Sequence, residues 1–188
     1  MKIIRTTPLF ALLLLISCKP DEPQPINIVV NGDMEAGSST PTGWTYYSGT
    51  TAVVGVWTDK VSRSPSKSLH TSAVVATASY TGLWFLQKCG DIPHGKTLVL
   101  KAMVKGNLLG AGASVALRGD DDDLSTPSAD QFASTQDNTP ITGSFDWKEY
   151  RVEFTKVEQS ISCLRIFLIY LPNTSGDVYF DNVSLEYN

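Results

Sequence analysis

The sequence predicts an all-β fold, a jelly-roll β-sandwich of two antiparallel sheets. No segment shows a long helical period of apolar residues. Short runs rich in β-branched and aromatic residues instead alternate with Gly, Pro, Asn, Asp and Ser, the residues of turns. About ten such runs in one domain favour a sandwich, and a jelly roll above other forms. The expected strands are residues 26–30, 44–47, 52–57, 68–76, 82–88, 97–105, 113–118, 147–155, 162–171 and 177–187.

Residues 1–17 have the features of a secretory signal and are not expected to belong to the fold. Lys2 and Arg5 precede an apolar run from Leu9 to Ile16, far shorter than the roughly 20 residues of a membrane-spanning helix. The run ends in a small residue followed by Cys18, which resembles the cleavage site of a bacterial lipoprotein. The resemblance implies lipidation of Cys18. The alternatives are an ordinary signal peptide with an incidental cysteine, or a short membrane anchor.

Residues 18–25 are expected to form the lipidated cysteine and a flexible linker. Three prolines between Lys19 and Pro25 favour an extended spacer that holds the domain off the membrane. The acidic residues just after Cys18 resemble the surface-export signal of lipoproteins in some Gram-negative bacteria. The expected location is therefore the outer membrane, with the domain of residues 26–188 facing the cell exterior.

Charge and cysteine content limit the partners of this domain. The chain has 15 basic and 19 acidic residues, and removal of two basic residues with the signal leaves a net charge of −6. An acidic domain without a basic stripe argues against nucleic acid and is compatible with neutral sugars. Cys89 and Cys163 remain, and the compartment permits a disulfide. Both could instead be buried thiols, and the interpretation leans slightly to unpaired cysteines.

Strand alternation predicts which side chains enter the core. The segment 164–170 is apolar on both sides apart from Arg165, which predicts a central strand whose second face is covered by a loop, a neighbour or a ligand. Residues 119–143 are rich in Asp, Ser, Thr and Pro and predict a long surface loop. The residues expected to point inward are Leu98, Leu100, Ala102, Val104, Tyr150, Val152, Phe154, Val183, Leu185 and Tyr187.

The sequence offers no recognisable catalytic motif. Its two histidines, His70 and His94, lack a nearby nucleophile pattern, and no zinc-binding spacing or Gly-rich phosphate loop occurs. Spacing along the chain does not test for a glycosidase pair of carboxylates from two strands. We therefore expect a protein without catalytic activity.

Five short motifs occur in a fixed order and carry a family resemblance. They are Asn31–Glu35, Pro41–Trp44, Ser64–Leu69, Asp146–Phe154 and Val178–Leu185. The pattern resembles the galactose-binding-like jelly rolls, and most of all the carbohydrate-binding modules of families four, nine and twenty-two. This resemblance implies that the first and last strands lie side by side. It also implies binding of a poly- or oligosaccharide without cleavage.

Many of these modules carry a structural calcium ion, and the resemblance implies Ca²⁺ here. The matching ligands are the carboxylates of Glu35 and Asp181 and carbonyl groups near Asn31 and Lys67, with Asp33 as a further carboxylate. Calcium prefers such a mixture of oxygen ligands. In the alternative, Asp181 hydrogen-bonds the neighbouring main chain without a metal.

Sugar sites combine an aromatic platform with planar polar groups. Trp44 and Trp147 lie within the family motifs and are expected in the core. In a regular strand, either Trp84 or Phe85 must face away from the core, and we expect Trp84 to do so. The expected ligand-binding residues are Trp84, Tyr80, Gln87, Arg118, Arg165 and Trp57.

Two other classes of function stay open. The runner-up is a structural or protein-interaction subunit of a surface complex, which a flat face without exposed aromatics would favour. A polysaccharide-cleaving enzyme would instead show a cleft with two facing carboxylates, or a Tyr and a His beside a basic residue. A carbohydrate-binding lipoprotein would work alone or beside a glycan-uptake or hydrolase partner.

Overall fold

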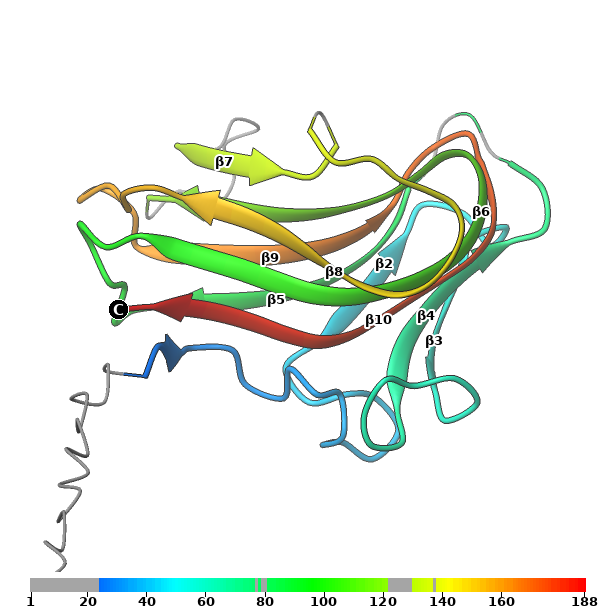
Figure 1. The fold of residues 1–188 in the computed structure, drawn as a ribbon, viewed down its shortest axis with the longest axis horizontal. Coiled ribbons are helices and arrows are strands. Elements are labelled where there is room, and N and C mark those ends of the chain that lie inside the picture. The colour runs from blue at the N-terminus through cyan, green and yellow to red at the C-terminus, as the bar shows by residue number, and fades with distance from the viewer. Residues whose placement is uncertain (1–23, 77, 79–80, 122–129, 137) are drawn as a thin grey trace, which may run out of the picture.

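The computed structural model describes residues 24–188 apart from 77, 79–80, 122–129 and 137, so Cys18 and the signal lie outside the described residues. The described chain is built from antiparallel β-strands (Figure 1). In this part of the chain there is no helix of a length and hydropathy that would cross a membrane. The strands are β1 (Ile26–Asn27), β2 (Thr45–Ser48), β3 (Val54–Thr58), β4 (Ser68–Ala73), β5 (Gly82–Cys89), β6 (Leu98–Asp120), β7 (Gln131–Ser134), β8 (Ile141–Phe154), β9 (Cys163–Tyr170) and β10 (Thr174–Tyr187).

The strands form a jelly-roll β-sandwich, which confirms the predicted fold class. They pair in the order β2-β5-β9-β6-β10-β4-β3, with β1 on β10 and with β7 and β8 on β6. We call β2, β5, β9, β7 and the second half of β6 the first layer. The second layer consists of β3, β4, β10, β8 and the first half of β6.

The long strand β6 joins the two layers into one nearly closed sheet (Figure 1). It bends between the layers at Gly110 and Gly112, whose φ angles are 92° and 86°. A side chain at Gly110 would also collide with the Asn173 carbonyl, 2.0 Å from an added Cβ atom. Glycine is required at this bend because it alone tolerates both the dihedral and the close contact.

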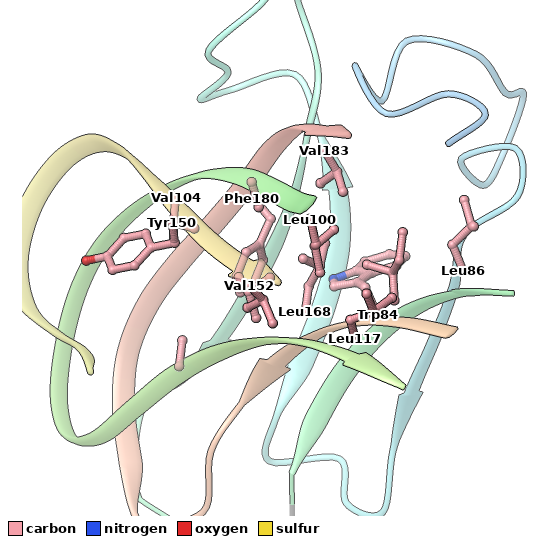
Figure 2. Packing of buried hydrophobic residues seen from close by; sticks show 14 of the residues in the cluster. Trp84, Leu86, Leu100, Val104, Leu117, Tyr150, Val152, Leu168, Phe180 and Val183 are labelled. Atoms are coloured by element: carbon pink, nitrogen blue, oxygen red, sulfur yellow. The ribbon is translucent and has the colours of Figure 1, made fainter. Parts of the chain in front are cut away.

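The core lies between the layers, and its composition confirms the predicted alternation. Leu98, Leu100, Ala102 and Val104 point inward from β6, and Tyr150, Val152 and Phe154 point inward from β8. Figure 2 shows side chains of both layers meeting in this core, with Trp84 among them. Burial of these apolar surfaces provides the main free energy of folding.

Pairing with β6 creates structure that the sequence did not suggest. Residues 97–105 and 113–118 belong to one strand, and the expected loop of residues 119–143 contains β7 and the start of β8. β7 pairs with Ala116–Gly119, so its main chain gains hydrogen bonds despite its polar composition. Trp147 is half-buried rather than in the core, because the alternation of β8 places it on the outward side with Glu149 and Arg151.

Cys89 and Cys163 form a disulfide, so the leaning towards unpaired thiols was wrong. The two residues are directly opposite one another in the β5–β9 pairing. The sequence placed Cys89 at a strand end and Cys163 inside an apolar strand, but it could not show that the two strands are neighbours. The bond therefore fixes the end of the central strand pair.

The first and last strands lie side by side, as predicted. β1 pairs with β10 through Ile26 opposite Tyr187. Further along, the Val183 N–H donates to the Gly32 carbonyl at 2.7 Å. The segment after β1 is thereby held against the end of the chain, and it brings Glu35 towards the loop before β4.

Candidate functional site

The outer face of the first layer, which we call the β5–β9 face, presents three rows of side chains. Residues directly opposite in antiparallel strands share a face, so the strand register defines the rows. The first row is Tyr47, Leu83 and Ile169; the second is Phe85 and Phe167; the third is Gln87, Arg165, Arg118 and Phe132. The third row crosses four strands, a span of roughly 14 Å at the usual strand spacing.

Aromatic side chains on this face are open to solvent. Tyr47 and Phe132 are 61% and 57% exposed, and Phe85 and Phe167 are half-buried. The rings of Phe85 and Phe167 are 6.4 Å apart between centroids and tilted by 47°. Together with Leu83, Gln87, Arg165 and Tyr47 they line a shallow hollow of about 400 Å³. The face therefore offers an apolar, partly aromatic platform on rigid strands.

Planar polar groups lie at one end of the platform. The Nε group of Arg165 donates to Gln87 Oε1 at 3.1 Å, and Gln87 Nε2 donates to Cys89 Sγ at 3.1 Å. Arg118 donates from Nε to Asp120 Oδ1 at 2.7 Å, and Asp120 is completely buried. The structure thus brings together Gln87, Arg118 and Arg165, three of the residues expected at the ligand site.

Trp84 does not belong to this face, which corrects the expectation from the sequence. Its side chain is only 4% exposed and packs in the core, where its ring lies 5.0 Å from that of Tyr46. The alternation in β5 turns Phe85 outward instead. Tyr80, the other aromatic residue expected here, lies outside the described residues.

Trp57 is also separated from the β5–β9 face. It lies on β3 in the second layer, where its indole N–H donates to the Met34 carbonyl at 2.7 Å. The Nζ of Lys67 covers its ring at 4.0 Å from the centroid. The protein thus contacts both the edge and one surface of the ring, and Trp57 also lines a hollow together with Trp84 and Tyr46.

Glu35 and Asp181, which we call the carboxylate clamp, grip the loop before β4 from two sides. Glu35 accepts hydrogen bonds from the main-chain N–H groups of Ser66 (3.0 Å) and Lys67 (2.8 Å) and from the Ser66 hydroxyl (2.6 Å). Desolvation opposes ionisation of Glu35, but these hydrogen bonds outweigh it and hold its pKa below the usual value.

Asp181 is fully buried and accepts three main-chain hydrogen bonds. Oδ2 accepts from the N–H groups of Arg63 (2.7 Å) and Ser64 (3.1 Å), and Oδ1 accepts from Asn182 (2.7 Å). Burial nevertheless raises the pKa of Asp181, and the nearby charge of Glu35 adds to this effect. The clamp thus joins the segment after β1, the last strand and the loop before β4.

The clamp does not fit a calcium site of the predicted kind. Such a site would take carbonyl oxygens from the segment around Lys67, whereas this segment turns its N–H groups towards the carboxylates. The Asn31 carbonyl already accepts from Trp44 Nε1 and the Met34 N–H, and exposed Asp33 accepts from the Glu35 N–H at 3.5 Å. Among the described residues, no three His, Cys, Asp or Glu side chains gather to hold a metal. The geometry agrees with the alternative in which carboxylates bond the main chain directly.

The outer face of the second layer carries a Tyr and a His beside a basic residue. His70 stacks on Tyr179 with centroids 4.3 Å apart, and Lys105 is opposite Tyr179 in the register. However, His70 Nε2 contacts Asp177 at 2.8 Å and Lys105 Nζ contacts Asp146 at 2.8 Å. A carboxylate on one ring nitrogen orients a histidine and does not disable it, so these contacts do not test the cleavage alternative.

Comparison with known proteins adds evidence on the fold. No protein-family model and no curated protein sequence matches the chain. Among solved structures, the enzymatically active domain of tailspike protein 4 from bacteriophage CBA120 aligns with a TM-score of 0.66 at 17% identity, over 87% of this chain. The chain spans only 22% of that tailspike chain. A Stig cyclase from Fischerella sp. TAU aligns with a TM-score of 0.59 at 20% identity, over 88% of this chain and 98% of the cyclase.

Carbohydrate-binding modules share the fold as well. TmCBM61, solved in complex with β-1,4-galactotriose, aligns with a TM-score of 0.54 at 15% identity, over 87% of this chain and 99% of the module. A family 11 module of Clostridium thermocellum and the xylan-binding CBM22-1 of Paenibacillus barcinonensis also align, each at 14% identity. At these identities the likeness shows the fold alone, and it confirms the β-sandwich shared with carbohydrate-binding modules.

Sequence reasoning missed the aromatic residues that the β5–β9 face exposes. Phe167 follows Arg165 by two residues, so its outward direction was already implied by the alternation of that strand. The choice between Trp84 and Phe85 could not be made from β5 alone, because the residues on both sides of this strand are apolar. Phe132 lay in a segment that gave no strand signal.

Proposed function

We propose that the protein binds a poly- or oligosaccharide on the β5–β9 face without cleaving it. The observation that carries this proposal is the exposed aromatic platform of Phe85, Phe167 and Tyr47 with Gln87 and Arg165 at its end. The apolar faces of sugar rings stack on aromatic rings, while amide and guanidinium groups bond hydroxyls in fixed directions. Both elements lie on paired strands, which hold them in place before the ligand arrives.

The shared fold is compatible with this proposal, although it is also found in the tailspike domain and the cyclase. Modules with the same sandwich include one solved with β-1,4-galactotriose and one described as xylan-binding. The exposed aromatics also favour sugar binding over a structural or protein-interaction subunit, for which we expected a flat face without them. The N-terminal signal and Cys18 complete the proposal of an outer-membrane lipoprotein that holds the domain at the cell exterior.

Affinity gel electrophoresis and a glycan array with the mature domain test this function. We expect retardation or capture by at least one plant, host or microbial polysaccharide. Replacing Phe85 or Phe167 by alanine should lower the affinity by about 5- to 100-fold, since stacking on one aromatic side chain contributes about 1–3 kcal/mol.

Tyr179→Ala is the matched control, because Tyr179 is an aromatic residue on the outer face of the opposite layer. It should leave the affinity unchanged. Absence of binding to every polysaccharide would refute the proposal. Equal losses in Phe85→Ala and Tyr179→Ala would instead place the site elsewhere.

A further inference from the structure

Two arginines face each other on the β5–β9 face, and within the described part of the chain only Arg118 has a carboxylate partner. Arg118 and Arg165 are directly opposite in the β6–β9 register. The charge of Arg118 is balanced by Asp120, whose carboxylate is fully buried and lies 2.6 Å from the Arg118 Nη2 atom. Among the residues that the structure describes, Arg165 has no ion pair, and its bond to Gln87 is to a neutral amide.

The free charge of Arg165 sits in apolar surroundings. Its neighbours in the hollow include Leu83, Phe85 and Phe167, and the side chain itself is half-buried. A guanidinium beside apolar walls is incompletely hydrated, so it gains more from a carboxylate than a fully exposed guanidinium does. A neutral sugar would cover this charge without compensating it.

We infer that the ligand is an acidic glycan, and that a uronate carboxylate binds the Nη groups of Arg165. The inference rests on the proposed function and names its substrate class. Gln87 Oε1 accepts the hydrogen bond from Arg165 Nε, so the two Nη groups remain for the ligand. Arginine is suited to this contact because its planar fork can donate two parallel hydrogen bonds to one carboxylate.

The arrangement of groups matches a sugar acid. Phe167 is two residues from Arg165 on the same strand face, roughly 7 Å away along the strand. A pyranose ring stacked on Phe167 therefore has Arg165 beside its edge, where a uronic acid carries its carboxylate. Gln87 is itself fixed by Cys89 of the disulfide, so Arg165 is held in position before binding.

The rest of the molecule disfavours indiscriminate binding of polyanions. The mature chain carries a net charge of −6, and Asp121 and Asp130 lie at the strand end beyond Asp120, where the Asp121 N–H donates to Asp130 Oδ2. The net negative charge therefore opposes the binding of polyanions in general, whereas Arg165 attracts a carboxylate. Binding of an acidic glycan would accordingly report this one contact and not a general basic patch.

The experiment compares acidic polymers with their own neutral forms. Isothermal titration calorimetry with polygalacturonate, alginate and hyaluronate is repeated with each polymer after chemical reduction of its carboxyl groups. We expect at least one acidic polymer to bind and its reduced form to bind about 10- to 100-fold more weakly, the range for a hydrogen-bonded ion pair. Arg165→Gln should lower affinity for the acidic polymer by the same factor and leave affinity for the reduced form unchanged.

Arg151→Gln is the matched control, because Arg151 is an exposed arginine of β8 in the second layer. It should bind the acidic polymer as the wild type does. Binding of neutral glycans with no preference for acidic ones would overturn the inference and leave the proposed function intact. An equal effect of Arg165→Gln on acidic and reduced polymers would also overturn it. Absence of binding to acidic, reduced and neutral polymers alike would overturn both.

Discussion

Removal of the Asp181 carboxylate tests whether the carboxylate clamp works without a metal. In Asp181→Ala, the main-chain N–H groups of Arg63, Ser64 and Asn182 lose their acceptor. A buried donor left without a partner costs about 1–3 kcal/mol, and water can reach part of this loop. We therefore expect a loss of about 2–4 kcal/mol in the free energy of unfolding.

The isosteric change Asp181→Asn refines this expectation. The amide oxygen can replace Oδ2, which accepts two of the three hydrogen bonds, while the amide nitrogen faces the Asn182 N–H. Burial raises the pKa of Asp181, so loss of the buried charge offsets part of the lost bond. We expect Asp181→Asn to cost about 1 kcal/mol, which is clearly less than the alanine variant.

Urea unfolding followed by fluorescence measures both costs, and thermal unfolding should show a decrease of roughly 4–16 °C for Asp181→Ala. Each measurement is made in EDTA and again in excess Ca²⁺. The metal-free clamp predicts the same midpoint in both for the wild type. If Ca²⁺ raises the wild-type midpoint and Asp181→Asn abolishes that response, a calcium site is present and the reasoning is wrong. A cost below 1 kcal/mol in both variants would show that the clamp is unimportant.

Three further predictions concern the core, the disulfide and acid stability. Trp84→Ala should destabilise the fold by about 3–5 kcal/mol, measured by urea unfolding, because it opens a cavity in the core; an unchanged midpoint would place Trp84 on the surface after all. Replacing both Cys89 and Cys163 by serine should lower the free energy of unfolding by about 2–5 kcal/mol, since the bond closes a sequence separation of 74 residues. Thermal unfolding of the wild type with and without reductant checks this. An identical unfolding temperature in the two conditions would show that the bond does not form. The hydrogen bonds from Lys101 and Ser184 hold the pKa of Glu186 below its usual value of 4.5. The ionised carboxylate therefore stabilises the fold above pH 4.5, and this stabilisation is lost as the pH falls through the lowered pKa. Glu186→Gln should flatten the decline of the unfolding free energy below pH 4.5, and an unaltered slope would contradict the assignment.

The elements that could be predicted were those with a period of their own. The run from Tyr150 to Phe154 alternates between apolar and charged residues, and the run from Leu98 to Val104 has an apolar residue at every second position. The predicted inward residues of both runs are buried in the core. β7 could not be predicted, because its polar residues form a strand only through pairing with β6. A segment of this kind takes its structure from a partner distant in the sequence.

The candidate site was predicted in part, and the limit has a physical cause. Gln87, Arg118 and Arg165 were named together because planar polar side chains within apolar strands are suited to bond sugar hydroxyls. Trp84 was misplaced because Leu83–Leu86 is apolar at every position. The segment alone therefore does not indicate which alternate residues of the strand face the core. Only the opposing layer makes that choice, by filling the space around Trp84 with side chains of the core (Figure 2).

By itself the sequence determined the class of fold, the inward side chains of residues 98–104 and 150–154 and the neighbouring positions of the first and last strands, because these follow from local periodicity and from motifs in a fixed order. The tertiary structure alone decided the disulfide, the direction of Phe85 and the use of Glu35 and Asp181 as acceptors for main-chain N–H groups. Each of these depends on which distant segments become neighbours. Contacts of that kind are set by the packing of whole layers, and no short window of the chain contains them.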